Sequence, residues 1–219
     1  MSVSSCSARG IRPVGSERTS FAAVVRERAV AYREPGGARI ASFGAENANG
    51  VPTVFSVRAA RLGTDCEPEW YRVQLPLKPN GVVGWVRARD VDLAKVTTRI
   101  LVDLSERRVM LFDGGRRVLS TPAAIGKPGT PTPTGRFYVN QRLHAADPSG
   151  PFGPAAVGIS AFSEVLTGWA QGGPIAIHGT NRPDLIGQAV STGCVRIRNE
   201  ALRMLFDRTR AGTPVTVRA

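Results

Sequence analysis

The strongest constraint on the fold of this chain is a repeated pattern of short apolar runs separated by turns that contain glycine and proline. Each run is a few residues long, which suits a β-strand and is too short for a buried helix. Between positions 21 and 93 the runs are 29–32, 54–57, 70–73 and 84–86, and the turns between them include Pro35-Gly36-Gly37, Asn49-Gly50 and Pro79-Asn80-Gly81. Asn-Gly readily adopts the positive φ angles of a tight hairpin, so we expect Asn80-Gly81 to connect two antiparallel strands. The pattern predicts a mainly β fold.

The second half of the chain continues this pattern. Apolar runs at 100–104, 108–112 and 117–119 predict a β-meander, and 126–139 predicts a proline-stiffened loop that enters a strand. Residues 147–173 are rich in Gly and Pro and are predicted to be a loop, which could be a lid, a substrate wall or a plain connection. One short helix is expected after Asn199, which would cap it, with Gly212 at its end and a closing strand at 214–217.

These observations predict three segments. Residues 1–20 are expected to be a disordered N-terminal tail, 21–94 a small all-β domain, and 96–219 a β-rich domain. A composition of 42% hydrophobic and 21% charged residues is that of an ordinary globular protein. The chain has no apolar run of about eighteen residues, so we expect no membrane-spanning helix.

The chain is strongly basic, with 29 Lys and Arg against 17 Asp and Glu and a formal net charge of +12. Such a charge attracts polyanions. Most of it comes from arginines scattered singly, without a Lys/Arg block or interleaved aromatic residues. We therefore interpret it as a solvated basic surface and expect no nucleic-acid partner.

The three cysteines include no Cys-x-x-Cys pair, which argues against a zinc site or a disulfide framework. Cys6 and Cys66 could pair and leave Cys194 free, but the sequence does not decide this. The first sixteen residues lack the basic head and apolar core of an intact secretory signal. Cys6 follows Val3-Ser4-Ser5, which loosely resembles the end of a lipoprotein signal; an incidental cysteine in a tail is the alternative.

The candidate catalytic residues lie between positions 175 and 199. His178 ends a predicted strand at 174–177, and Cys194 follows the predicted tight turn Ser191-Thr192-Gly193. A free thiol is only slightly ionised at pH 7, and a neighbouring imidazole that accepts its proton makes it an effective nucleophile. The backbone N–H groups of Gly193 and Cys194 are expected to act as oxyanion donors. A buried structural thiol and a core histidine are the alternative.

This stretch resembles the signature of the L,D-transpeptidases, the YkuD-type catalytic domain of bacterial cell-wall enzymes. The matching residues are His178-Gly179-Thr180, then Ser191-Thr192-Gly193-Cys194-Val195-Arg196-Ile197, and Asn199. Thr192 replaces a histidine that many members carry, a difference that concerns rate or substrate preference more than reaction type. A second match is Thr132-Pro133-Thr134-Gly135-Arg136-Phe137. Residues 70–91 are similar to the bacterial SH3-like modules that precede such domains.

The resemblance implies an SH3-like small barrel followed by a YkuD-type β-sandwich. It implies an acyltransferase of peptidoglycan biosynthesis that supports cell-wall organisation and cell shape. Cys194 would be the nucleophile, His178 the base and the Gly179 carbonyl its orienting group. Ser191, Thr192, Gly193, Arg196 and Asn199 would form the substrate-binding and oxyanion region, although Arg196 could instead pin the cysteine turn. No metal or organic cofactor is needed.

The family also implies the partners and the location. Peptidoglycan stem peptides would be the substrates, the SH3-like domain would contact wall polymers, and the protein would act as a monomer outside the cytoplasm, in the cell envelope. Three alternatives remain: an L,D-carboxypeptidase, another wall-acting thiol hydrolase such as an endopeptidase or amidase, and a wall-binding protein that has lost activity. Thr192 is the residue that favours the last.

Overall fold

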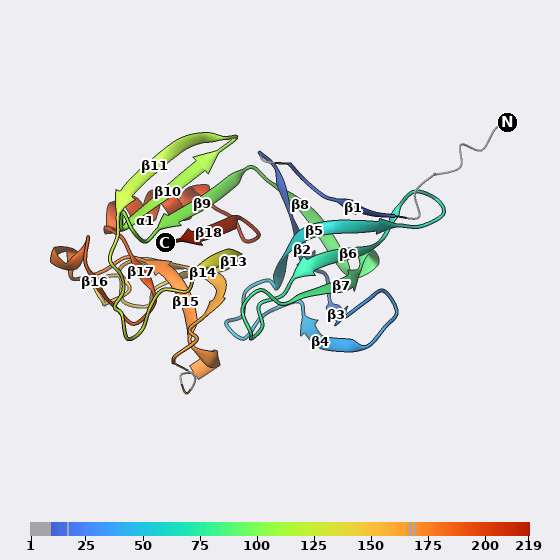
Figure 1. Cartoon of the computed structure of the whole chain (residues 1–219), viewed down its shortest axis with the longest axis horizontal. Coiled ribbons are helices and arrows are strands. Elements are labelled where there is room, and N and C mark those ends of the chain that lie inside the picture. The colour runs from blue at the N-terminus through green and yellow to red at the C-terminus, as the bar shows by residue number, and fades with distance from the viewer. Residues whose placement is uncertain (1–9, 17, 167, 169) are drawn as a thin grey trace.

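The computed structural model describes residues 10–16, 18–166, 168 and 170–219. Two eight-stranded sheets make up most of this part of the chain, one from each half of the sequence (Figure 1). A mainly β fold is therefore confirmed. Within the described residues no helix is long and apolar enough to cross a membrane.

The first sheet is formed by residues 11–96 in the strand order β4-β3-β7-β6-β5-β2-β8, with β1 paired to β5. All of its pairings are antiparallel. Its strands are β1 Ile11–Pro13, β2 Ser20–Val25, β3 Arg28–Tyr32, β4 Arg39–Gly44, β5 Val54–Leu62, β6 Pro68–Gln74, β7 Val83–Arg87 and β8 Val91–Val96. The predicted hairpin is confirmed, because β6 and β7 pair and residues 80–81 lie in their connection.

The predicted disorder of residues 1–20 is wrong for β1. Strand β5 is nine residues long, and β2 pairs only with residues 54–56 of it. Residues 59–61 of β5, on the edge that faces β2, are therefore left without a partner strand, and β1 pairs with them. An unpaired strand edge favours such an addition. Residues 1–9, which include Cys6, lie outside the described residues, so whether Cys6 pairs with Cys66 is not tested.

The second sheet has the order β11-β10-β9-β18-β13-β14-β15-β17, and β12 and β16 form a separate pair. The bounds are β9 Thr98–Asp103, β10 Arg108–Asp113, β11 Arg116–Pro122, β12 Ile125–Gly126, β13 Gly135–His144, β14 Ala155–Phe162, β15 Pro174–His178, β16 Ala189–Ser191, β17 Val195–Arg196 and β18 Pro214–Arg218. Strands β9, β10 and β11 form the predicted meander. The closing strand β18 lies between β9 and β13.

The prediction of a loop at 147–173 is wrong for residues 155–162, which form β14. This strand lies between β13 and β15 and is buried along nearly its whole length. Five of its eight residues are Ala, Gly or Ser, so only Val157, Ile159 and Phe162 supply the β-branched and aromatic side chains that mark a strand in sequence. Pairing on both edges supplies the stability that local propensity does not.

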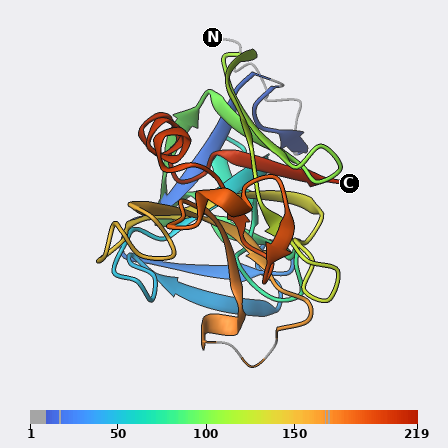
Figure 2. The same ribbon diagram turned by 90° about the vertical axis from the view of Figure 1, so that its left-hand side faces the viewer.

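One hydrophobic core serves the whole second sheet. Buried side chains from β9, β10, β13, β14, β15, β17 and β18 belong to a single cluster together with Leu202, Leu205 and Phe206 of the helix α1, Asn199–Arg208. Figure 2, which views the molecule from the side of this sheet, shows α1 as the coiled red ribbon. The helix and its apolar face are as predicted, but the helix ends at Arg208, before Gly212.

A single residue, Thr97, forms the covalent connection between the two sheets, since β8 ends at Val96 and β9 begins at Thr98. Side chains from two loops of the first half also form hydrogen bonds with the second sheet. The Asn80 side chain bonds the backbone of Phe162 through both its Nδ2 and its Oδ1 (2.9 and 2.8 Å). The Nδ2 of Asn49 donates to Oε1 of Gln141 at 2.8 Å. Gly212, in the turn before β18, packs against Ala22 of β2.

The contact between Gly212 and Ala22 gives a matched test of this interface. Gly212 and Gly187 have nearly the same φ, 92° and 93°. A Cβ at Gly187 would meet nothing within 4 Å, whereas one at Gly212 would overlap the Cβ of Ala22. We expect Gly187→Ala to lower the free energy of unfolding by about 1–2 kcal/mol, and Gly212→Ala by about 1–3 kcal/mol more. Urea denaturation measures both; equal losses would contradict the packed interface.

Candidate active site

Strands β15 and β17 bring His178 and Cys194 to one face of the second sheet. The two strands are parallel, with Ile177 opposite Val195 and His178 opposite Arg196. Ile177 and Val195 are fully buried in the core. Because side chains alternate along a strand, His178 and Arg196 point to the other face. Cys194 directly precedes β17 at the level of Ala176. It therefore shares that face with His178, on the neighbouring strand and offset by two residues, about 7 Å, along the strand direction.

The His178 ring is held in one orientation and one tautomer. The side chain is 3% exposed, and its Nδ1 lies 2.6 Å from the carbonyl oxygen of Gly179. A carbonyl only accepts, so Nδ1 carries the proton and Nε2 keeps its lone pair. The expected contact between the imidazole and Gly179 is therefore present. The Phe152 ring packs on the imidazole with centroids 4.8 Å apart, a contact that the sequence did not indicate.

Burial keeps both groups uncharged. Desolvation, helped by the charge of Arg196, lowers the pKa of His178 to about 4, although the hydrogen bond with Gly179 opposes the shift. Desolvation also raises the pKa of Cys194, against a backbone hydrogen bond at Ala176 and the charge of Arg196. Cys194 is a half-buried free thiol. At neutral pH the resting site therefore holds a thiol and a neutral imidazole, not an ion pair.

The turn before Cys194 is fixed by Ser191. Its hydroxyl accepts from the Gly193 N–H at 3.1 Å and donates to the Cys194 carbonyl at 2.5 Å. The Gly193 N–H is therefore engaged inside the turn in the free protein, so an oxyanion would compete with the Ser191 hydroxyl for it. The N–H of Cys194 has no backbone acceptor within the described residues, so it is the available donor here. Gly193 has φ +116°, and a Cβ there would press on Ile175.

The proline-stiffened loop after β12 supports this turn. The Lys127 N–H and the Thr130 hydroxyl both donate to the Ser191 carbonyl, at 3.0 and 3.1 Å. The loop is itself closed by a bond from the Gly126 N–H to the Thr132 hydroxyl at 2.9 Å. Thr132, the first residue of the second matching segment, thus closes the loop that contacts Ser191 of the first, and β12 pairs with β16 beside it.

Asn199 does not cap the helix as the sequence suggested. It is the first residue of α1, and the preceding Arg198 makes no side-chain cap. The Asn199 Oδ1 instead accepts from the Thr180 N–H at 2.9 Å. A Cβ on either Gly153 or Gly179 would overlap that oxygen. Asn199 therefore fixes the segment that follows His178. Positions 153 and 179 require glycine, because any side chain there would overlap the Asn199 amide.

Arg196 supplies a positive charge beside the pair. Its backbone bonds to Ala124 in both directions at 2.8 Å, so the residue is fixed in the sheet. Its side chain is half-buried, and its Nε is buried without a hydrogen-bond partner in the described part of the chain. Thr192, at the tip of the turn, is exposed. No group of three or more His, Cys, Asp or Glu residues that could hold a metal occurs among the described residues.

Comparisons with known proteins identify the family of the second half of the chain. A model of the YkuD family, described as the L,D-transpeptidase catalytic domain, matches residues 97–217. The proteins named YkuD from Bacillus licheniformis and Bacillus subtilis, both named as L,D-transpeptidases, are each 36% identical to this chain over 119 and 118 residues. Each alignment covers 54% of this chain and 64% of the relative, so the chain matches less than two thirds of those proteins.

Solved structures of proteins titled L,D-transpeptidases are also similar. The catalytic domain from Enterococcus faecium aligns with 55% of this chain and 96% of its own, with 28% identity and a TM-score of 0.41. An enzyme from Mycobacterium tuberculosis H37Rv aligns with 76% of this chain and 90% of its own, with 18% identity and a TM-score of 0.49.

The charge state of the site gives a direct prediction. In an NMR titration of the imidazole signals, His178 should titrate near pH 4, because burial disfavours its cation. Phe152→Ala should raise that midpoint by admitting water, and Arg196→Gln should raise it by removing a cation. Val165→Ala is a control, since Val165 and Phe152 are both 52% exposed.

A wild-type midpoint near the ordinary 6.5 would contradict the buried neutral imidazole. The lowered pKa also has a consequence for stability. As the pH falls, the His178 imidazole is protonated in the unfolded chain, near pH 6.5, before it is protonated in the folded chain, near pH 4. The free energy of unfolding should therefore decrease as the pH falls from 6.5 toward 4.

Proposed function

Because the chain belongs to the YkuD family of L,D-transpeptidase catalytic domains, we propose that it is a cysteine-dependent acyltransferase that cross-links peptidoglycan stem peptides. The observation that carries the proposal is the pairing of β15 with β17, which sets a free thiol and an oriented neutral imidazole on one face. The donor would be a tetrapeptide stem that ends in D-alanine.

In the first step the sulfur of Cys194 attacks the carbonyl carbon that precedes the terminal D-alanine. The thiol proton passes to Nε2 of His178, whose Nδ1–H remains bonded to the Gly179 carbonyl. The C–N bond then breaks, the D-alanine amine takes the proton from Nε2, and a thioester remains on Cys194. A base whose pKa is about 4 is unprotonated at neutral pH and returns the proton readily.

In the second step a side-chain amine of another stem attacks the thioester carbon. It gives a proton to His178, and the departing Cys194 sulfur recovers a proton as the new amide forms. The Cys194 N–H would stabilise the oxyanion in both steps, because the Gly193 N–H is engaged by Ser191. The partnerless Nε of Arg196 supports a further role for this side chain in holding a substrate carboxylate.

We also propose that the first sheet is an SH3-like module that contacts wall polymers, on the sequence likeness of residues 70–91. The protein would act outside the cytoplasm, where stem peptides occur, and as a monomer.

The decisive experiment is intact-mass analysis of the wild type and of Cys194→Ser after addition of a donor tetrapeptide stem and then an acceptor stem. We expect an acyl adduct on the wild type and none on the variant, followed by cross-linked product. His178→Ala should slow adduct formation by about 10²- to 10⁴-fold, since it removes the base.

Other outcomes would change the assignment. An adduct released only as tripeptide would make the protein an L,D-carboxypeptidase. Cleavage within the stem or at its sugar linkage would indicate an endopeptidase or amidase. No adduct, together with binding to wall sacculi by a folded protein, would support the inactive binding protein.

The contact of Asn199 with Thr180 predicts a positioning effect on the same reaction. Asn199→Ala removes the acceptor of the Thr180 N–H and should slow acylation by about 10- to 100-fold, because the segment after His178 would shift. Asn199→Asp keeps an acceptor of the same size and should restore most of the rate. Melting curves identify any variant that fails to fold. An unchanged rate in a folded Asn199→Ala would contradict this role.

A further inference from the structure

A basic cleft that the catalytic residues do not explain lies at the junction of the two sheets. Its volume is about 860 Å³, and the described residues that line it include five arginines and no Asp or Glu. We call it the arginine cleft and define it by Arg18, Arg58, Arg99, Arg116 and Arg136.

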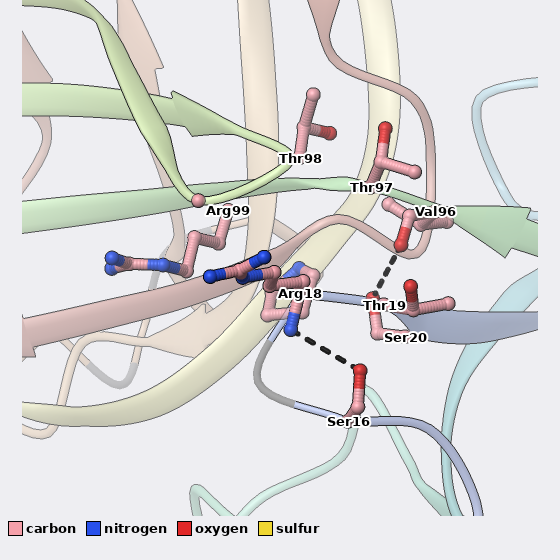
Figure 3. A pocket seen from close by; sticks show the side chains of 10 residues that line it. Ser16, Arg18, Thr19, Ser20, Val96, Thr97, Thr98 and Arg99 are labelled. Carbon is pink, nitrogen blue, oxygen red and sulfur yellow. Dashed lines mark hydrogen bonds between the residues drawn. The ribbon is translucent and has the colours of Figure 1, made fainter.

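Both halves of the chain contribute to the arginine cleft. Arg18 precedes β2 and Arg58 lies in β5, whereas the other three lie in β9, β11 and β13. A smaller adjoining pocket of about 160 Å³ also includes Arg18, Arg99 and the linker residue Thr97. Figure 3 shows that pocket, with the Arg18 and Arg99 side chains extending toward the same side of the view. Gly115 in the β10–β11 turn gives Arg18 room, since a Cβ there would lie 3.4 Å from the Arg18 Nε.

The arginines of the cleft repel one another, and the part of the chain that the structure describes places no carboxylate in an ion pair with them. None of them forms an ion pair within the described residues; the four ion pairs found there involve other arginines. Arg58 is half-buried, and desolvation and the charge of Arg136 lower its pKa. It is nevertheless held in place by Gln74, which accepts from its guanidinium and donates to the Arg136 carbonyl at 2.8 Å. Gln74 is only 2% exposed, so this arrangement is built into the interface.

We propose that the arginine cleft binds an anionic polymer that carries repeated phosphate groups and no bases. Arginines from five segments of the chain line one concavity. A phosphate accepts hydrogen bonds from several directions, whereas the two coplanar oxygens of a carboxylate suit a single guanidinium fork. A cavity of this volume accommodates several such groups. The aromatic residue that lines it, Phe137, is 2% exposed, so no stacking platform for bases is present in the described lining.

The arginine cleft is separate from the candidate active site. Arg136 lies at the beginning of β13, whereas Leu143 near its other end is opposite Ala156, which in turn is opposite His178. Seven residues of extended strand separate the two levels, which corresponds to about 20 Å. A bound polymer would therefore leave Cys194 accessible, and the inference does not rest on the proposed catalytic function.

The test uses the full chain, a fluorescently labelled glycerol phosphate oligomer and fluorescence anisotropy between 50 and 200 mM salt. The test variant is Arg99→Gln/Arg116→Gln/Arg136→Gln, which spares the half-buried Arg58. The control variant Arg39→Gln/Arg203→Gln/Arg208→Gln removes the same charge from three other exposed arginines. We expect the cleft variant to weaken binding by more than about tenfold. The slope of the logarithm of the binding constant against the logarithm of the salt concentration should fall in magnitude by about two to three. The control should change the affinity by less than about twofold.

Three results would overturn the proposal. Equal weakening by both triple variants would show that diffuse surface charge is responsible. Polyglutamate of matched length binding as tightly as the glycerol phosphate oligomer would show that phosphate is not preferred. Single-stranded DNA binding more tightly than the oligomer, with the same sensitivity to the cleft variant, would replace a base-free polymer with a nucleic acid.

Discussion

The candidate active site depends on the parallel pairing of β15 with β17, two strands of which the second has only two residues. The core of the second sheet holds this pairing in place, because the partners Ile177 and Val195 are both fully buried there. Once those two side chains face inward, strand alternation places His178, Arg196 and Cys194 on the opposite face. The chemistry of the site is therefore fixed by hydrophobic packing beneath it, and a one-residue slip of β17 would bury the thiol and expose the core.

Two parallel strands need a long connection, and the connection between β15 and β17 also helps to position the catalytic residues. Residues 179–194 pass under Asn199, pair through β16 with β12, and end in the turn that Ser191 closes. Each of these contacts uses the backbone of the connection. The loop is consequently held at its beginning by Asn199, which bonds Thr180 two residues after His178, and at its end by Ser191, which bonds the Cys194 carbonyl. Substrate binding then needs to supply little ordering of the catalytic groups.

Much of this architecture could be predicted from the sequence, because strand periodicity, turns and the helix face are local properties. The meander, the β6–β7 hairpin, the strand that ends at His178 and the apolar face of α1 are all of this kind. The features that could not be predicted depend on distant partners. Strand β14 is stabilised by pairing with β13 and β15. The Asn199 side chain accepts a hydrogen bond from Thr180 and does not cap its own helix. Phe152, in a loop, packs against the His178 ring. The hydrogen bond from the Gly193 N–H to the Ser191 hydroxyl was likewise not indicated by the sequence, and an oxyanion would compete with it.

The arginines illustrate the same point for charge. Along the sequence they are scattered singly, which favours the interpretation of a solvated surface, and folding brings five of them around one cavity. Their mutual repulsion opposes the association of the two sheets, which are joined covalently by Thr97 alone. Buried contacts such as Gly212 against Ala22, and neutral bonds such as those of Gln74 and Asn80, must offset that repulsion in the free protein. An anion in the cleft would neutralise charge contributed by both sheets, so binding it would also strengthen the junction between them.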